Sequence, residues 1–192
     1  MIFHFENDII KCISVLHKGG LILYPTDTIW GIGCDATNTE AVAKIYALKK
    51  RQDEKSMVIL LGEEKEILNH VTLPNPKIFD YIKGVQKPTT VVYEGGTGLA
   101  PNLIRKNDGT VAIRVTGDRF CKQLIAHYGK PLVSTSANIS GYPPPAVFTD
   151  IDVAILNGVD YVVEYRQDET IPSHPSSIIK WNADGSVTII RS

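Results

Sequence analysis

A short apolar segment that stops at a proline constrains this chain more than any other feature. Residues 21–24 form an apolar run typical of a buried strand, and Pro25 cannot continue a hydrogen-bonded ladder. Thr26-Asp27-Thr28 follow, and then Gly31 and Gly33, which we expect to let the chain turn beneath a site. Hydroxyls, a carboxylate and glycines directly after a buried strand predict a ligand site at the strand end.

Two further segments have the composition of ligand-binding loops. Lys49-Lys50-Arg51 follows a predicted helix, and the hydroxyl-rich residues 134–138 follow another apolar strand. Each also has an ordinary explanation. Cations in the last turn complement a helix dipole, and serine, threonine and asparagine side chains cap helices and turns. Together with the first segment, they predict that three loops meet around an anionic small molecule.

Arg114 lies inside the apolar residues 111–115, which read as a strand. A buried guanidinium needs an anionic partner, because an uncompensated charge inside a protein is costly. The partner is either an internal carboxylate or a ligand.

Helical and extended patterns alternate along the chain and predict an α/β fold. Residues 177–181 and 187–190 are joined by a strong hairpin signal at 182–185, so the sheet is expected to be mixed rather than purely parallel. Thr37 and Glu40 have capping-box spacing at the start of a helix. The chain has 192 residues and no convincing linker, which predicts a single domain over residues 1–192. Strands are further expected at residues 2–5, 57–61, 89–93, 132–134 and 161–164.

Composition excludes several classes of protein. With 20 basic and 21 acidic residues, the chain does not have the charge of a protein that coats nucleic acid or an anionic membrane. The three cysteines lack CxxC spacing and the five histidines form no HxxH pair, so neither a disulfide framework nor a protein-held metal is indicated. The sequence shows no signal peptide and no segment of transmembrane length, which predicts a cytoplasmic protein without membrane contact.

Four motifs follow one another at suitable spacing: YPTDTIWGIGCDA from Tyr24, KKR from Lys49, STSANISG from Ser134 and PSSI from Pro175. This ordered set resembles the YrdC-like family, and in particular its threonylcarbamoyl-AMP synthases. The resemblance implies a twisted, mixed parallel and antiparallel sheet with flanking helices around a deep, positively charged cavity. It also implies a nucleotidyltransferase that condenses L-threonine, bicarbonate and ATP into threonylcarbamoyl-AMP and pyrophosphate, for the t6A modification of tRNA adenosine 37.

The resemblance carries over to individual residues. The catalytic residues it implies are Lys49 and Arg51. The ATP-binding residues it implies are Arg51, Lys55, Thr110, Ser136, Asn138 and Arg191. The threonine-binding residues it implies are Thr28, Arg114, Ser134 and Ser176. Mg²⁺ is expected to arrive with ATP rather than in a protein cluster, and the downstream partners are proteins that transfer the threonylcarbamoyl group to tRNA.

The chain departs from the family pattern at several positions. Gln52 and Thr116 stand where the family usually has proline, Ser177 replaces a threonine, and residues 86–90 are a shortened form of a longer motif. Two alternatives stay open. One is a module for RNA binding or ribosome assembly that uses the cavity as a basic groove, although near-neutral charge and the lack of interleaved aromatics count against it. The other is a sister carbamoyl-transfer domain acting on carbamoyl phosphate, which usually sits inside a larger chain.

Overall fold

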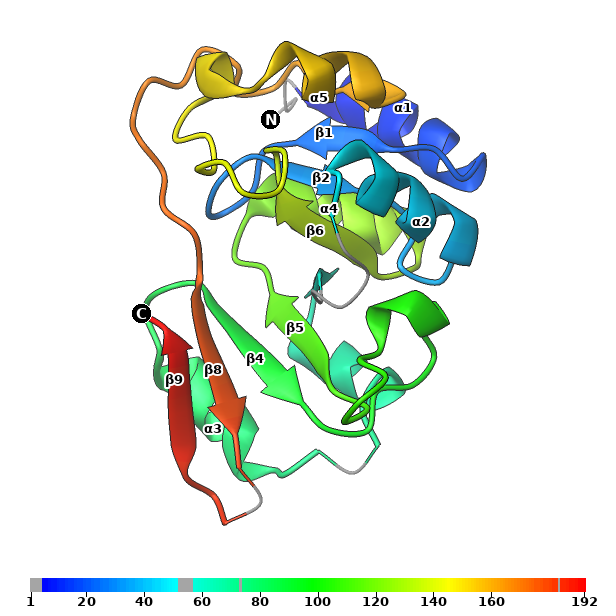
Figure 1. The fold of residues 1–192 in the computed structure, drawn as a ribbon. Helices are drawn as coiled ribbons and strands as arrows, with labels where there is room; N and C mark the ends of the chain where they lie inside the picture. Colours follow the sequence, from blue (N-terminus) through cyan, green and yellow to red (C-terminus); the bar gives the residue numbers. More distant parts are fainter. Residues whose placement is uncertain (1–4, 52–56, 73, 183) are drawn as a thin grey trace.

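The computed structural model describes residues 5–51, 57–72, 74–182 and 184–192 (Figure 1). Its α-helices are α1 (Glu6–His17), α2 (Thr39–Leu48), α3 (Lys77–Gly84), α4 (Arg119–Tyr128) and α5 (Val153–Gly158). Its strands are β1 (Ile22–Tyr24), β2 (Gly31–Gly33), β3 (Val58–Leu61), β4 (Thr89–Tyr93), β5 (Val111–Val115), β6 (Leu132–Ser136), β7 (Tyr161–Val162), β8 (Ser177–Trp181) and β9 (Val187–Arg191).

The strands form a mixed sheet, as the sequence predicts. They pair in the order β7-β1-β2-β6-β3-β5-β4-β8-β9. The pairs β1/β7, β3/β5 and β4/β8 are parallel, and the other neighbours are antiparallel. The predicted hairpin is confirmed, with β8 and β9 antiparallel around residues 182–185. Helix α1 packs against α4 beside β1, whereas α3 lies next to β8 and β9 at the other end of the molecule (Figure 1).

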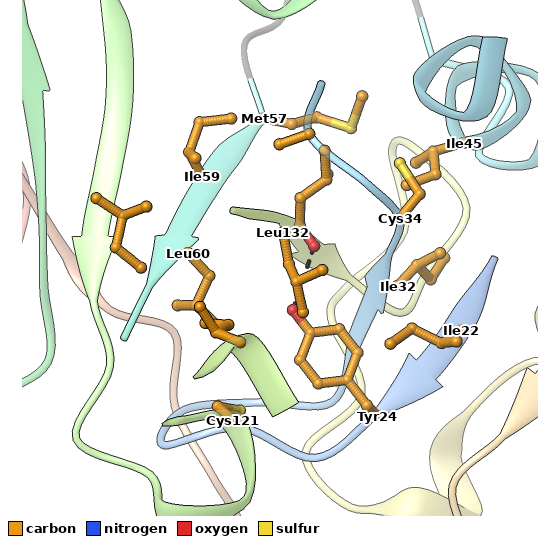
Figure 2. Packing of buried hydrophobic residues seen from close by; sticks show 14 of the residues in the cluster. Ile22, Tyr24, Ile32, Cys34, Ile45, Met57, Ile59, Leu60, Cys121 and Leu132 are labelled. Atoms are coloured by element: carbon orange, nitrogen blue, oxygen red, sulfur yellow. Dashed lines mark hydrogen bonds between the residues drawn. The ribbon is translucent and has the colours of Figure 1, made fainter. Parts of the chain in front are cut away.

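The core lies along the middle strands, where side chains on both faces are buried. Figure 2 shows Ile22, Ile32, Leu60 and Leu132 converging from four strands, with Tyr24 beneath them. Tyr24 is fully buried, and its hydroxyl donates to the Val133 carbonyl oxygen at 3.2 Å. Continuous apolar runs such as 58–61 are therefore strands covered on both sides, which explains why they lack the alternation of a half-exposed strand.

Gly31 and Gly33 belong to strand β2, so the prediction that they let the chain turn was wrong. A Cβ atom on Gly33 would lie 2.6 Å from Cε1 of Tyr24 and 2.8 Å from the carbonyl oxygen of Val133. Glycine is required at Gly33 because the Tyr24 ring packs directly onto the strand backbone. This is the close-approach role of glycine rather than its turn-forming role.

We predict that Gly33→Ala lowers the free energy of unfolding by about 1–3 kcal/mol, because the backbone oxygen of Val133 cannot rotate away from the added methyl group. Urea denaturation followed by far-UV circular dichroism measures the effect. Gly84→Ala is the matched control, since a Cβ there meets no atom within 4 Å. Equal denaturation midpoints for the two variants would contradict this account of Gly33.

Two local predictions are corrected by the structure. Helix α2 is capped by Asn38 and not by Thr37. The Oδ1 atom of Asn38 accepts hydrogen bonds from the backbone N–H groups of Glu40 and Ala41. The Thr37 hydroxyl instead donates to Asp35 at 2.6 Å. Strand β6 continues to Ser136, beyond the predicted end at residue 134. Most of the strand expected at residues 2–5 lies outside the described residues.

In the described part of the chain, no helix is long and apolar enough to cross a membrane.

Candidate active site

A cavity of about 240 Å³ lies where the β1–β2 connection, the end of β6 and the start of β8 meet. Its walls also include side chains from β5 and β9 and from the segment after α2. The cavity is lined by seven of the residues predicted from the sequence: Thr28, Arg51, Arg114, Ser134, Ser136, Ser176 and Arg191. The three loops expected to meet around one ligand therefore do meet.

An internal carboxylate accompanies the buried charge of Arg114. Its Nη2 atom lies 3.3 Å from Oδ1 of Asp27, which forms an internal ion pair. Asp27 is held in turn by the backbone N–H of Gly117, which donates to Oδ2 at 2.9 Å. Within the described part of the chain, the Nε and Nη2 atoms of Arg114 make no hydrogen bond. Arg114 thus has a carboxylate neighbour, although neither atom meets the geometry of a hydrogen bond to a described residue.

Arg191 closes the cavity from the end of β9. Its Nε and Nη2 atoms donate to the Ser176 carbonyl oxygen at 3.0 and 2.8 Å, which orients the guanidinium beside the Ser176 hydroxyl. That hydroxyl shares a 2.8 Å hydrogen bond with Thr90 on β4. Burial, and then the charge of Arg114, lower the pKa of Arg191.

Three guanidinium groups therefore share one cavity. Burial also lowers the pKa of Arg51, and no carboxylate is among the described residues that line the walls. Cations gathered in a partly enclosed space raise the local positive potential, so we expect the cavity to favour an anion.

Lys49, which the resemblance implies is catalytic, does not line this cavity. Its side chain is only 1% exposed, and its ammonium donates to the carbonyl oxygens of Ser136 and Asn138 and to Oδ1 of Asn138. Burial, and then the charge of Arg51, lower the pKa of Lys49 to about 7. The structure thus places Lys49 beneath the loop after β6, where it fixes the backbone that carries Ser136.

Two other predicted ATP contacts lie away from the cavity. The side chain of Asn138 faces its own loop, where Nδ2 donates to the carbonyl oxygens of Ile139 and Tyr142 at 3.0 and 2.6 Å. Thr110 precedes β5, is buried, and donates through its hydroxyl to Asp108 at 2.7 Å. Lys55 and Gln52 lie outside the described residues.

The sequence motifs did not predict the apolar walls of the cavity. Trp30, Met57 and Ile178 all line it, and the Trp30 ring packs on Phe148 with ring centroids 4.8 Å apart. Trp30 lies two residues beyond Thr28 in the same motif, so its position in that motif could have indicated that it borders the site. Met57 and Ile178 read as ordinary strand residues, and only the strand pairing reveals that they border the cavity.

The chain is similar to known proteins along most of its length. A family model named for Sua5, YciO and YrdC, and described as telomere recombination, matches residues 14–192. A threonylcarbamoyl-AMP synthase of Coxiella burnetii (strain RSA 493 / Nine Mile phase I) is 34% identical over 162 residues, which cover 82% of this chain and 83% of the relative. A threonylcarbamoyl-AMP synthase of Pseudoalteromonas translucida (strain TAC 125) is 35% identical over 139 residues, which cover 71% of this chain and 74% of the relative.

Solved structures share the fold at lower identity. Sua5 of P. abyssi complexed with L-threonine superposes with a TM-score of 0.84 and 21% identity, covering 97% of this chain and 54% of that one. This chain therefore spans about half the length of that Sua5. The E. coli YciO structure gives a TM-score of 0.83 at 20% identity and covers 97% of this chain and 89% of that one. Because the family model matches nearly the whole sequence and both synthases exceed 30% identity, the chain belongs to the Sua5/YciO/YrdC family.

Proposed function

We propose that this protein is a threonylcarbamoyl-AMP synthase, a nucleotidyltransferase that joins L-threonine, bicarbonate and ATP. The observation that carries the proposal is the meeting of Arg51, Arg114 and Arg191 in one cavity that serine and threonine hydroxyls also line. Two relatives that share about a third of their residues with this chain bear that enzyme's name. The reaction brings two anionic reactants together, so it needs positive charge at the point of contact.

Arg114 is the proposed partner of the threonine carboxylate. Arg114 lines the cavity together with Thr28, Ser134 and Ser176, and its Nε and Nη2 atoms make no hydrogen bond to a described residue. A planar guanidinium matches a carboxylate with two parallel hydrogen bonds. Hydroxyls around the amino-acid side chain would favour threonine over valine, because valine would leave them without a partner.

Arg51, Arg191 and Ser136 are the proposed contacts of the ATP phosphates, together with Lys55 as implied by the sequence. The amine of threonine attacks bicarbonate and water is lost, which gives a carbamate. A carbamate oxygen then attacks the α-phosphorus of ATP, and pyrophosphate leaves with the electrons of the broken P–O bond. The arginines lower the repulsion between the carbamate and the triphosphate and hold them in line.

Among the described residues there is no group of three His, Cys, Asp or Glu side chains placed to hold a metal ion. We propose that Mg²⁺ arrives with the nucleotide, bound to the ATP phosphates, where it would neutralise their charge. The product is a mixed anhydride, which suits transfer by partner proteins to tRNA in the cytoplasm.

The proposal predicts that pyrophosphate release depends on every substrate. We expect release from ATP only when L-threonine and bicarbonate are both present, with a product of the mass of threonylcarbamoyl-AMP. Valine in place of threonine is the specificity control, and it should support little release. Pyrophosphate release that persists when threonine or bicarbonate is omitted would overturn the proposal. Salt-sensitive binding of duplex RNA without turnover would instead favour the RNA-binding module.

A further inference from the structure

The segment between β7 and β8 runs from one end of the sheet towards the other, and it reaches the cavity at Ser176 (Figure 1). The first part of this segment is fixed to two helices. The backbone N–H of Tyr165 donates to Asp8 of α1 at 3.0 Å, and the Tyr165 ring stacks on Phe120 of α4 with ring centroids 5.9 Å apart. Arg166 therefore follows directly after an anchored residue.

Arg166 has a backbone conformation that residues other than glycine seldom adopt. Its φ angle is +69°, which lies in the left-handed region. The backbone N–H of Glu169 donates to the Arg166 carbonyl oxygen at 3.3 Å, which closes a turn. Glycine would avoid the steric cost of this conformation, so an arginine here indicates that its side chain has a role.

The Arg166 guanidinium joins helix α4 to the loop after β1. Its Nη1 atom donates to Oδ2 of Asp118 and to the Thr26 carbonyl oxygen, each at 3.1 Å, and its Nε atom donates to Glu169 at 2.7 Å. Asp118 is a fixed point, because its Oδ1 atom caps α4 by accepting from the backbone N–H of Cys121 at 2.8 Å. The side chains of Arg166 and Asp118 are only 20% and 14% exposed, so water screens this ion pair less than a surface pair.

The start of α4 also holds the residues on either side of Thr26. The Cys121 thiol donates to the Pro25 carbonyl oxygen at 3.3 Å, and the backbone N–H of Gly117 donates to Asp27 at 2.9 Å. The guanidinium supplies the contact between these two. Three consecutive residues of the loop are therefore tied to one end of a packed helix.

Thr26 determines in turn how Thr28 can form hydrogen bonds. A hydroxyl has one proton to donate and two lone pairs that accept. The Thr26 hydroxyl donates to the Ile29 carbonyl oxygen at 2.8 Å and accepts from the backbone N–H of Thr28 at 3.0 Å. In the 2.9 Å bond between the two hydroxyls, Thr28 is therefore the donor. Thr28 lines the cavity, and any hydrogen bond that its hydroxyl makes to a ligand there is one that it accepts.

We propose that Arg166 is a positioning residue for recognition of the amino acid. By holding the Thr26 carbonyl oxygen to Asp118, it keeps the Thr28 hydroxyl oriented to accept a hydrogen bond from the amine or the hydroxyl of the substrate. This inference rests on the proposed function, because it takes L-threonine as the amino acid. Arg166 is not among the described residues that line the cavity, so it acts on the substrate through the loop.

Calorimetric titration with L-threonine, in the absence of turnover, tests the proposal. Arg166→Gly removes the guanidinium and suits the left-handed backbone. We expect this variant to bind threonine about tenfold more weakly, close to the full effect of one hydrogen bond, and to bind a non-hydrolysable ATP analogue as the wild type does. Lys11→Met is the matched control, because Lys11 pairs with Glu164 of the same segment at 3.3 Å. It should bind threonine with wild-type affinity.

Thr28→Val separates positioning from a general loss of structure. Without the Thr28 hydroxyl, Arg166 has no group to position, so adding Arg166→Gly to Thr28→Val should weaken threonine binding no further. Binding of the ATP analogue, which should persist in every variant, establishes that each is folded.

Two results would overturn the role of Arg166. One is wild-type threonine affinity in Arg166→Gly, and the other is an equal tenfold loss whether or not the Thr28 hydroxyl is present. Either result would leave the proposed function standing. A wild-type protein that binds no threonine would instead contradict the proposed function itself.

Discussion

Arg114→Met is expected to lower kcat/KM for threonine about a thousandfold, a loss of about 4 kcal/mol in transition-state stabilisation. Arg114 is the strand cation whose Nε and Nη2 atoms have no hydrogen bond in the described part of the chain, so it is the group best placed to take a carboxylate. Pyrophosphate release at varied threonine concentration measures the effect. Arg114→Lys keeps the charge but loses the planar fork, and it should fall between the wild type and Arg114→Met.

Loss of activity in Arg114→Met must be separated from loss of folding. The substitution leaves Asp27, whose side chain is 13% exposed, without its cation, and breaking one side of a buried pair costs about 3 kcal/mol. The double variant Asp27→Asn/Arg114→Met removes both charges. We expect it to recover most of the lost stability in urea denaturation and none of the lost activity. A double variant with near wild-type turnover would show that Arg114 serves only to neutralise Asp27.

The sequence motifs are enough to locate much of this site, because the residues they contain lie on strands or directly after them. Thr28 follows β1 within four residues, and Ser134 and Ser136 lie on β6 itself. Pairing of β2 with β6 brings Gly31 opposite Ser136, which joins the first and third predicted loops. Arg114 was found from a physical conflict, a charge within an apolar strand, and the structure resolves that conflict with Asp27.

Other features depend on contacts between distant segments and could not be read from local pattern. Gly33 looked like a turn residue, but the Tyr24 ring on the adjacent strand requires the absence of a side chain. Thr110 matched a family position, yet its hydroxyl is bonded to Asp108.

We expect the second large effect from Lys49→Met, which should lower kcat about a hundredfold. The ammonium holds the carbonyl oxygens of Ser136 and Asn138, so its loss frees the loop that carries the Ser136 hydroxyl. A displacement of about 1 Å in a positioning group can cost two orders of magnitude in rate. Lys50→Met is the matched control, because Lys50 is the adjacent lysine and its side chain is exposed. It should retain wild-type turnover.

The pattern of kinetic constants separates positioning from direct contact. If Lys49 acts through the loop, KM for ATP and for threonine should change little while kcat falls. A proportionate rise in KM for ATP at unchanged kcat would show instead that Lys49 binds the nucleotide directly. Turnover in Lys49→Met equal to that of Lys50→Met would exclude both roles.

The pH dependence of stability supplies a readout that is independent of turnover. The pKa of Lys49 falls from its ordinary value of 10.5 to about 7, first through burial and then through Arg51. Between pH values of about 7 and about 10.5, Lys49 is protonated in the unfolded chain and neutral in the folded chain. The contribution of Lys49 to the free energy of unfolding therefore increases as the pH rises from about 7 to about 10.5. Lys49→Met should lose this slope and Lys50→Met should keep it, because the slope arises only where an amine is buried under the Ser136 loop.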